Sequence, residues 1–386
     1  MKRYDYIIAG GGLAGLSLAY YMNQSILRSK SILIIDKDDK VQNDRTWCFW
    51  EKDGQGEFDP IVFRRWKQVL FYGSNGFEKR LDLGDYTYKW IRGIDFYDHV
   101  RLQLEANPNI TFLTTNIERL SDTSDGGFVI TDDGQFIADY IFDSITPLSL
   151  DKPQRHNMLQ HFKGWEITTP QPVFDLSAPT MMDYRVEQQG VGVRFGYVLP
   201  INQNRALVEY TVFSDKLLNQ EEYDKELHTY IRDFLKIRDF TIEDEEFGVI
   251  PMTDERPKVS KRNHIIKIGT SGGYVKASTG YAFKRTQRFT QELVSQLLTT
   301  GKPQPRKKTF RQWFKNLLDS TLLNVFLENR YSGKAVFTRL YKNNPTPRLF
   351  AFLDEDTSLW EDLQVMSTVP LGAFARGLVG SLFRRF

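Results

Sequence analysis

The feature that most constrains the fold of this chain is a glycine-rich turn near its N-terminus. Residues 10–15, GGGLAG, fit the pattern GxGxxG. They follow an apolar stretch typical of a buried strand (residues 4–9) and precede one typical of a helix (residues 13–23). A turn of this composition between a strand and a helix predicts a dinucleotide-binding βαβ unit.

Three glycines of this turn have distinct expected roles. Gly10 permits the tight turn, Gly12 lets a pyrophosphate approach the backbone, and Gly15 allows close packing of the helix. The helix N-terminus adds free N–H groups and a positive dipole. Asp36 ends the next apolar strand, 21 positions after Gly15, where its carboxylate can accept hydrogen bonds from a ribose. We therefore expect Gly10, Gly12, Gly15 and Asp36 to bind a cofactor, and the long mixed insertion after this unit favours FAD over NAD.

A second glycine-rich segment follows the core strand predicted near residues 265–269. It contains Gly269 and Gly272, and Gly280 lies just beyond it, where a helix is predicted from about residue 279 to 298. The N-terminus of such a helix could face the flavin ring and stabilise negative charge on its N1/O2 edge. The same pattern also arises where a glycine loop simply starts a helix.

Composition excludes several function classes. The chain has 386 residues with 51 basic and 49 acidic side chains, and this net charge of +2 argues against a nucleic-acid binder working by bulk electrostatics. Cys48 is the only cysteine, which rules out an internal disulfide or a cysteine-rich zinc site and fits a reducing compartment. The five histidines form no HExxH pattern and no i, i+4 pair, so no metal is expected, and no GxSxG elbow supports serine hydrolysis.

The uncharged segment from Tyr6 to Leu27 could be mistaken for a signal peptide or a membrane span. Four glycines and the polar Asn23 and Gln24 interrupt it, and no other stretch approaches the ~20 apolar residues that a span requires. We expect a cytoplasmic protein that is not integral to a membrane.

The remaining pattern predicts an α/β protein: a Rossmann-type FAD/NAD(P)-binding domain with an inserted antiparallel-sheet substrate domain and a helical C-terminal appendage. We expect the dinucleotide-binding domain to comprise residues 1–158 and 245–300 and the substrate region to comprise residues 159–244. The helical C-terminal region is expected over residues 301–386.

Glu209 is the main candidate for a catalytic acid. It lies in a predicted strand, and the two-residue period places it on one face with Leu207, Thr211 and Phe213. Partial desolvation on this apolar face would raise the pKa of the carboxyl group and keep it protonated near neutrality. An exposed strand residue or a satisfied core carboxylate would give the same pattern. Glu166 and Asp183 are weaker candidates of the same kind.

The segment Asn43 to Trp50 mixes polar groups with three aromatic residues just after the ribose position. It is either a buried loop in which Trp47 and Trp50 pack, or a loop beside cofactor or substrate that brings Arg45 to the cofactor.

In the tail, basic residues 306–308 precede a run of Phe, Leu and Trp between 310 and 326 that suits a basic amphipathic helix at a membrane surface, as does the segment 382–386. Packing of these helices on the protein body is the alternative.

Several segments together resemble one family, the flavin-dependent lycopene cyclases of the bacterial and plant type. The glycine turn is common to many flavoproteins, so the specific parts are the Thr-Trp loop, the Leu-Pro turn leading into the Val-Glu strand, and the Thr-Gly-Tyr segment. The matching segments are Tyr4–Gly15, Arg45–Trp50, Met182–Asp183, Phe195–Pro200, Ala206–Ser214, Gly248–Met252 and Ser278–Tyr281. One departure is clear: relatives often carry His-Pro where this chain has Lys276-Ala277, which puts in doubt any role of a histidine there.

The resemblance implies a lycopene β-cyclase that forms β-carotene by way of γ-carotene without net redox change. It implies Glu209 as the acid, bound reduced FAD with NAD(P)H as electron donor, and access to the carotenoid at a membrane surface. The alternatives are a flavin-dependent isoprenoid hydroxylase or reductase, and a non-catalytic carotenoid- or FAD-binding carrier. Mono- or bicyclic product, ring type, NADPH or NADH, and oligomeric state stay open.

Overall fold

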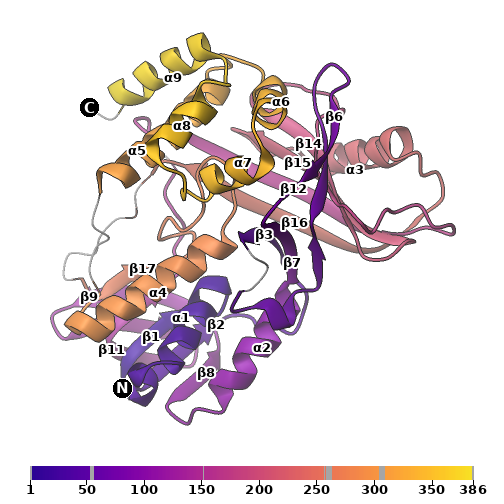
Figure 1. The fold of residues 1–386 in the computed structure, drawn as a ribbon. Helices are drawn as coiled ribbons and strands as arrows, with labels where there is room; N and C mark the ends of the chain where they lie inside the picture. Colours follow the sequence, from indigo (N-terminus) through magenta and orange to yellow (C-terminus); the bar gives the residue numbers. More distant parts are fainter. Residues whose placement is uncertain are drawn as a thin grey trace.

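The computed structural model describes residues 2–52, 56–150, 152–255, 257, 263–303 and 309–384. Within these residues, the fold contains a first sheet of seven strands at the N-terminus, a long second sheet of seven strands, and a small sheet of three. A group of C-terminal helices lies beside the second sheet (Figure 1).

The first sheet has the parallel order of a dinucleotide-binding fold. Its strands run β8-β2-β1-β11, with β17 paired to β11 and the antiparallel β10 and β9 extending the other edge. The bounds are β1 Lys2–Ala9, β2 Ile32–Asp36, β8 Ile110–Thr114, β9 Ile117–Thr123, β10 Gly126–Thr131, β11 Gly134–Asp143 and β17 Ile265–Lys267. Residues 6–9 of β1 and 32–35 of β2 are runs of buried apolar residues because both faces of the sheet are covered. Ile8 and Ile34 pack with the helices, and Ile7 and Ile35 pack with Val129 of β10 on the other face.

Three helices pack near this sheet. α1 (Leu13–Asn23) contacts α4 (Phe283–Thr300) and α2 (Gly93–Glu105), and short 3₁₀ turns lie at Ile26–Ser29 and Asp59–Ile61. The helix predicted from about residue 279 to 298 is α4, and its expected start is wrong, because α4 begins at Phe283. Gly280 has φ +75°, a left-handed conformation that cannot be part of an α-helix.

The second sheet has the order β16-β12-β15-β14-β13-β5-β6 and is antiparallel except where β13 meets β5. The bounds are β5 Gln68–Tyr72, β6 Glu78–Asp82, β12 Asn157–Thr168, β13 Thr180–Asp183, β14 Val193–Pro200, β15 Arg205–Ser214 and β16 Thr241–Thr253. Strands β5 and β6 come from the N-terminal part of the chain, so the sheet is assembled from two separate segments. The expected domain limits stay a prediction.

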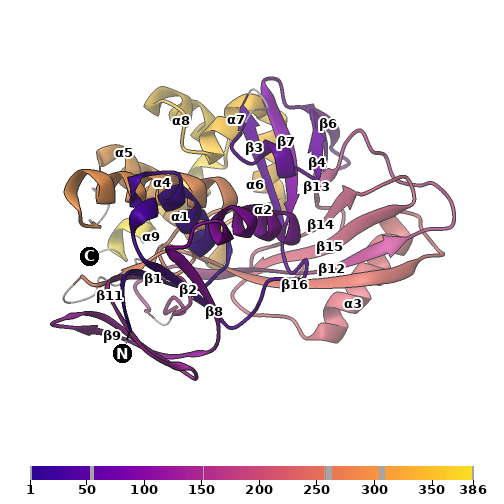
Figure 2. The same ribbon diagram turned by 90° about the horizontal axis from the view of Figure 1, so that it is seen from below.

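The two faces of the second sheet bury different sets of side chains. Val208 and Tyr210 pack against α3 (Gln220–Thr229) and the π-helical turn that follows it (Tyr230–Phe234). Leu207 and Phe213 pack on the opposite face, toward the small sheet and the C-terminal helices. The small sheet has the order β3-β7-β4, with bounds β3 Thr46–Lys52, β4 Arg64–Trp66 and β7 Tyr86–Arg92. Figure 2 shows the long strands extending away from the first sheet, with α3 below them and the small sheet above. The side chains of β15 thus alternate between the two faces of the sheet, which confirms the predicted two-residue period of the strand that carries Glu209.

The C-terminal region is helical, and most of its first helix is buried. Its helices are α5 (Phe310–Leu327), α6 (Gly333–Asn343), α7 (Thr346–Leu353), α8 (Leu359–Met366) and α9 (Leu371–Phe383). In α5, Leu317 and Phe326 belong to the core, and Lys315 is buried in an ion pair with Asp362. Only Phe310 and Trp313 among the apolar side chains singled out in this helix are strongly exposed. The helix therefore packs on the body along most of its length. The basic segment 306–308 and residues 385–386 lie outside the described residues.

None of the described helices is both long enough and apolar enough to cross a membrane.

Candidate functional site

A cavity of about 510 Å³ connects the glycine turn at the N-terminus with Glu209 in the second sheet. Its wall includes Gly12 at one end, Arg45 and Gly269 along the way, and Glu209 among aromatic side chains at the other end. Five of the predicted site residues therefore line one cavity: Gly12, Arg45, Glu209, Gly269 and Gly280. Gly10, Gly15, Asp36 and Gly272 do not line it.

The three glycines of the turn have different surroundings. Gly10 has φ +107°, and a side chain there would lie 2.1 Å from Ser144 Oγ. A Cβ at Gly15 would lie 1.9 Å from the carbonyl oxygen of Gly10, so this glycine allows the helix to approach the turn. A Cβ at Gly12 would meet no atom within 4 Å, and Gly12 lines the cavity at the N-cap of α1, where no side chain caps the helix. Space for a ligand therefore exists at Gly12, whereas the other two glycines shape the turn.

Asp36 ends β2 beside this turn. Its Oδ2 accepts a hydrogen bond from Gly11 N at 2.6 Å, and its Oδ1 accepts one from Asp38 N at 2.9 Å. Asp36 lines a small separate depression, and Lys40 is part of the wall of both this depression and the large cavity. The carboxylate thus holds the glycine turn in place, and a ribose contact at Asp36 stays a prediction.

The second glycine loop forms part of the cavity wall through Gly269 and Gly280, both in left-handed conformations. A Cβ at Gly280 would lie 2.0 Å from Gln160 Oε1, a buried acceptor with no hydrogen-bond partner among the described residues. A Cβ at Gly272 would collide with the backbone at Lys267, and Gly272 lines a second cavity of about 420 Å³. Gly272 thus lies outside the first cavity, and its cofactor role stays a prediction.

The turn before α4 is fixed to the C-terminal helices by a buried ion cluster. Lys276 donates to both carboxylate oxygens of Asp319 at 2.8 Å and to Glu355 Oε1 at 2.9 Å. Burial lowers the pKa of Lys276, but the two carboxylates outweigh it, and the pKa is raised overall. Lys276 therefore anchors this loop to α5 and to Glu355, just after α7.

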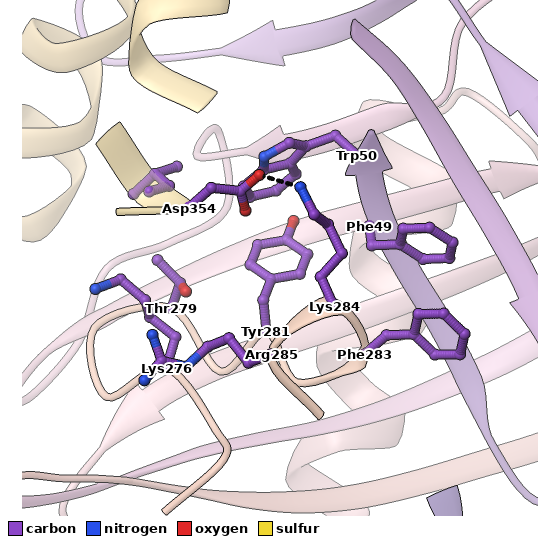
Figure 3. Close-up of a pocket in the computed structure, with 10 residues that line it drawn as sticks. Phe49, Trp50, Lys276, Thr279, Tyr281, Phe283, Lys284, Arg285 and Asp354 are labelled. Carbon is purple, nitrogen blue, oxygen red and sulfur yellow. Dashed lines mark hydrogen bonds and ion pairs between the residues drawn. The ribbon is translucent and has the colours of Figure 1, made fainter. Parts of the chain in front are cut away.

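Figure 3 shows how aromatic side chains surround this turn. The Tyr281 ring lies 4.6 Å from the Trp50 ring in an edge-on arrangement, and Lys284 forms an ion pair with Asp354 beside them. Tyr88 connects the hydroxyl groups of Tyr281, at 3.3 Å, and Tyr197, at 2.6 Å. Aromatic side chains of β3, β7 and β14 thus meet Tyr281 where the turn before α4 approaches the second sheet. Trp50 is a packing residue, whereas Trp47 lines the cavity.

Arg45 lies at the start of β3 and lines the cavity, with its side chain 55% exposed. Its guanidinium lies 4.0 Å from the Asp44 carboxylate. The next residue, Thr46, donates its backbone N–H to Glu246 Oε1 at 3.2 Å. The polar loop therefore borders the candidate cofactor space and also contacts the second sheet.

Glu209 is 7% exposed and lies in the middle of β15 on the cavity face. Burial raises the pKa of its carboxyl group well above the ordinary value, and the neighbouring Glu246 raises it further. Both effects favour the protonated carboxyl, the form that a proton donor needs.

Sequence reasoning missed Glu246, a second carboxylate in the same cavity. In the sheet register Gly164 of β12 pairs with Glu209 on one side and with Glu246 on the other, so the two carboxylates flank a glycine on one face. Burial also raises the pKa of Glu246, while the hydrogen bond from Thr46 and the charge of Arg45 oppose this. The available signal was that Glu246 lies just before the segment Gly248–Met252, which resembles the family.

The two weaker carboxylate candidates are satisfied elsewhere. Asp183 accepts hydrogen bonds from Arg185 Nε at 2.9 Å and from the Tyr230 hydroxyl at 3.0 Å. Glu166 forms an ion pair with Arg205. Neither lines the cavity. Within the described residues, no group of three or more His, Cys, Asp or Glu side chains is placed to hold a metal ion.

The residues present fit a bound dinucleotide. A glycine with open space around it lies at an uncapped helix N-terminus, which is the arrangement that binds a pyrophosphate. The cavity continues from there past the orphaned acceptor Gln160 Oε1. The parallel sheet, the glycine turn and the attached antiparallel sheet together define a protein of the flavoprotein fold.

Solved structures share this fold. A geranylgeranyl bacteriochlorophyll reductase-like protein from Thermoplasma acidophilum superimposes with a TM-score of 0.68 at 11% identity, over 97% of this chain and 98% of that one. A flavoprotein/dehydrogenase from Cytophaga hutchinsonii gives 0.65 at 10% identity, over 98% and 99%. At these identities the likeness concerns the fold alone.

A family comparison is more specific. The sequence profile described as "Lycopene cyclase protein" matches residues 5–378, and the chain belongs to this family. The chain is also 23% identical over 299 residues to a chloroplastic lycopene beta cyclase of Nicotiana tabacum. That alignment covers 73% of this chain but only 58% of the tobacco protein.

Proposed function

We propose that this protein is a lycopene β-cyclase that closes the linear ψ-end groups of lycopene into β-ionone rings. The observation that carries the proposal is the position of Glu209: a buried carboxyl, its pKa raised by burial, on the wall of a cavity that extends to the glycine turn. Family membership supplies the class of reaction. The aromatic and apolar wall around Glu209 suits a hydrocarbon substrate.

In the proposed reaction Glu209 donates its proton to C2 of the end group, leaving a cation at C1. The C5=C6 double bond captures this cation by forming the C1–C6 bond, and a proton is then lost from C6. One proton enters and one leaves, so no electrons are transferred. The faces of Phe195, Phe213 and Tyr197 offer π-electrons to the positive charge and exclude water that would capture it.

The cofactor proposed for the other end of the cavity is FAD. Gly12 and the N-terminus of α1 would hold its pyrophosphate, and Arg45, Gly269 and Gly280 would border the rest. Reduced FAD would supply negative charge that stabilises a nearby cation without being consumed, and NAD(P)H is the proposed source of its electrons.

The decisive experiment is expression of the chain in a lycopene-accumulating bacterium, with pigment extraction and mass spectrometry. A product of unchanged mass with β-rings supports cyclisation, whereas added hydrogens or oxygen would identify a reductase or hydroxylase instead. Glu209→Gln should abolish the product while retaining flavin. Glu166→Gln is the matched control, since this carboxylate lies in the same sheet outside the cavity. If wild-type protein binds pigment or flavin without turnover, a carrier role replaces the cyclase proposal.

The carotenoid substrate resides in lipid, so we further propose that the protein contacts a membrane surface without crossing it. Large apolar side chains are exposed on the C-terminal helices, including Trp360 at 69%, Leu371 at 64% and Phe383 at 78%. Such side chains favour the interface between headgroups and acyl chains. Co-sedimentation with lipid vesicles should fall for Trp360→Glu, and unchanged sedimentation would exclude this surface.

A further inference from the structure

Three acidic side chains line the large cavity within the part of the chain that the structure describes: Asp44, Glu209 and Glu246. Asp44 accepts a hydrogen bond from the Tyr97 hydroxyl at 2.8 Å and lies 3.6 Å from Lys40, near the glycine turn. Asp44 is therefore held by groups of the first sheet's side of the cavity, although its charge reaches Glu246. Glu209 and Glu246 remain as two carboxylates on one face of the second sheet.

The arrangement of this pair follows from the sheet register. Glu209 on β15 and Glu246 on β16 both flank Gly164 of β12. Neighbouring strands are about 4.8 Å apart, so the two backbones are separated by roughly 9.6 Å. Gly164 has no side chain to fill the space between them, and a Cβ there would lie 2.8 Å from Glu209 Cγ. The Glu209 side chain thus leans over Gly164, and both carboxyl groups line the same cavity from strands on either side of β12.

The surroundings of the two carboxyl groups differ in the partners that they offer to a negative charge. Glu209 is surrounded by apolar groups, and both burial and its neighbour favour its neutral form. Burial and the charge of Asp44 leave the pKa of Glu246 raised overall, but unlike Glu209 it has two partners that favour its anion: the hydrogen bond from Thr46 N and the charge of Arg45. Two titratable groups whose surroundings push their pKa values apart are typical of an acid and a base that act on one substrate.

We propose that Glu246 is the base of the reaction: it accepts the proton released from C6 and returns it to Glu209. The inference rests on the proposed cyclase function. In the first step the O–H bond of Glu209 breaks and the C2–H bond forms. In the last step the C6–H bond breaks, its electron pair restores the C5=C6 double bond, and the proton passes to the Glu246 carboxylate. Proton transfer from Glu246 back to Glu209 resets the pair, and nothing is oxidised or reduced.

The test compares Glu246→Gln with Glu209→Gln in D₂O, using purified protein with reduced FAD and lycopene in vesicles. Without its base, the enzyme should form rings at least about 100-fold more slowly. The cation formed by Glu209 would then revert by losing a proton at C2, so recovered lycopene should carry deuterium. With Glu209→Gln no cation forms, and recovered lycopene should stay unlabelled. Glu246→Asp keeps a carboxylate and should restore part of the rate.

Glu245→Gln is the matched control, because Glu245 is the preceding residue of β16, points to the opposite face and is exposed. Its rate and product should equal those of wild type. The proposal is overturned if Glu246→Gln cyclises within threefold of wild type, if it is slow but leaves lycopene unlabelled, or if Glu246→Asp is no better than glutamine. Flavin content and thermal unfolding show whether each variant is folded. Failure of the wild-type protein to form rings would instead remove the cyclase function itself.

Discussion

Replacing Gly164 by alanine tests whether the space between the two carboxylates matters. The new Cβ would lie 2.8 Å from Glu209 Cγ and 3.1 Å from Leu207 Cδ1, whereas ordinary contacts begin at 3.4 Å. The Glu209 side chain must therefore move by about 0.6 Å. Both obstructing atoms belong to side chains, and Glu209 borders the cavity, so they can give way without moving the backbone.

The expected effects on stability and on activity differ. Overpacking costs ~1–3 kcal/mol, and because the neighbours can move, we expect the lower end, about 1 kcal/mol of unfolding free energy. A displacement of ~1 Å at a reacting group can lower the rate about 100-fold, so a shift of 0.6 Å should lower ring formation by roughly tenfold or more. Activity should therefore fall far more than stability, with flavin retained.

Urea unfolding, flavin absorbance and product formation measure the three quantities on one preparation. Gly372→Ala in α9 is the control, since a Cβ there meets no atom within 4 Å and should leave the rate unchanged. A wild-type rate for Gly164→Ala would refute the idea that Glu209 needs this space. A loss of more than about 3 kcal/mol would show instead that Gly164 is needed for the fold.

Three further predictions concern the cofactor turn, the buried ion cluster and one histidine. Gly12→Val should lower flavin occupancy but leave the apoprotein folded, because a side chain there meets only open space. Gly15→Ala places its Cβ 1.9 Å from a backbone oxygen and should lower the unfolding free energy of the apoprotein by about 3 kcal/mol. Equal effects of the two variants in urea unfolding would contradict this. Lys276→Ala leaves the buried Asp319 without its cation, whereas Glu355 keeps Arg285, and should cost ~3–5 kcal/mol. A loss below about 1 kcal/mol would exclude an anchoring role. Burial lowers the pKa of His161 to about 4 from 6.5, so the unfolded chain binds a proton first, and stability should fall as pH drops from about 6.5 to 4. Urea midpoints that do not change across this window would contradict the expected linkage.

Local features of the sequence predicted the cofactor half of the site. The turn at Gly12 and the carboxylate at Asp36 lie within one βαβ unit, where strand and helix periods and glycine spacing are properties of neighbouring residues. The helix start at residue 279 was wrong, because the left-handed Gly280 instead ends a tight turn in which its N–H donates to the Lys276 carbonyl. A left-handed glycine is not visible in a pattern of residue types.

The C-terminal helix α5 illustrates a different limit. Its apolar and basic residues suited a membrane surface, yet Lys315 is buried against Asp362, and most of the apolar side chains pack on the body. An amphipathic pattern gives the width of an apolar face but not the surface that covers it.

The sequence by itself determined the glycine turn, the strand that carries Glu209 and the face on which its side chain lies, because these depend on the alternation of residues along one segment. Only the tertiary structure decided that Glu246 shares that face and that Gly164 separates the two carboxylates. Strand register is set by packing across the sheet, between segments distant in the chain, and desolvation follows from that packing. The raised pKa of Glu209 is therefore a property of the assembled cavity and not of the strand alone.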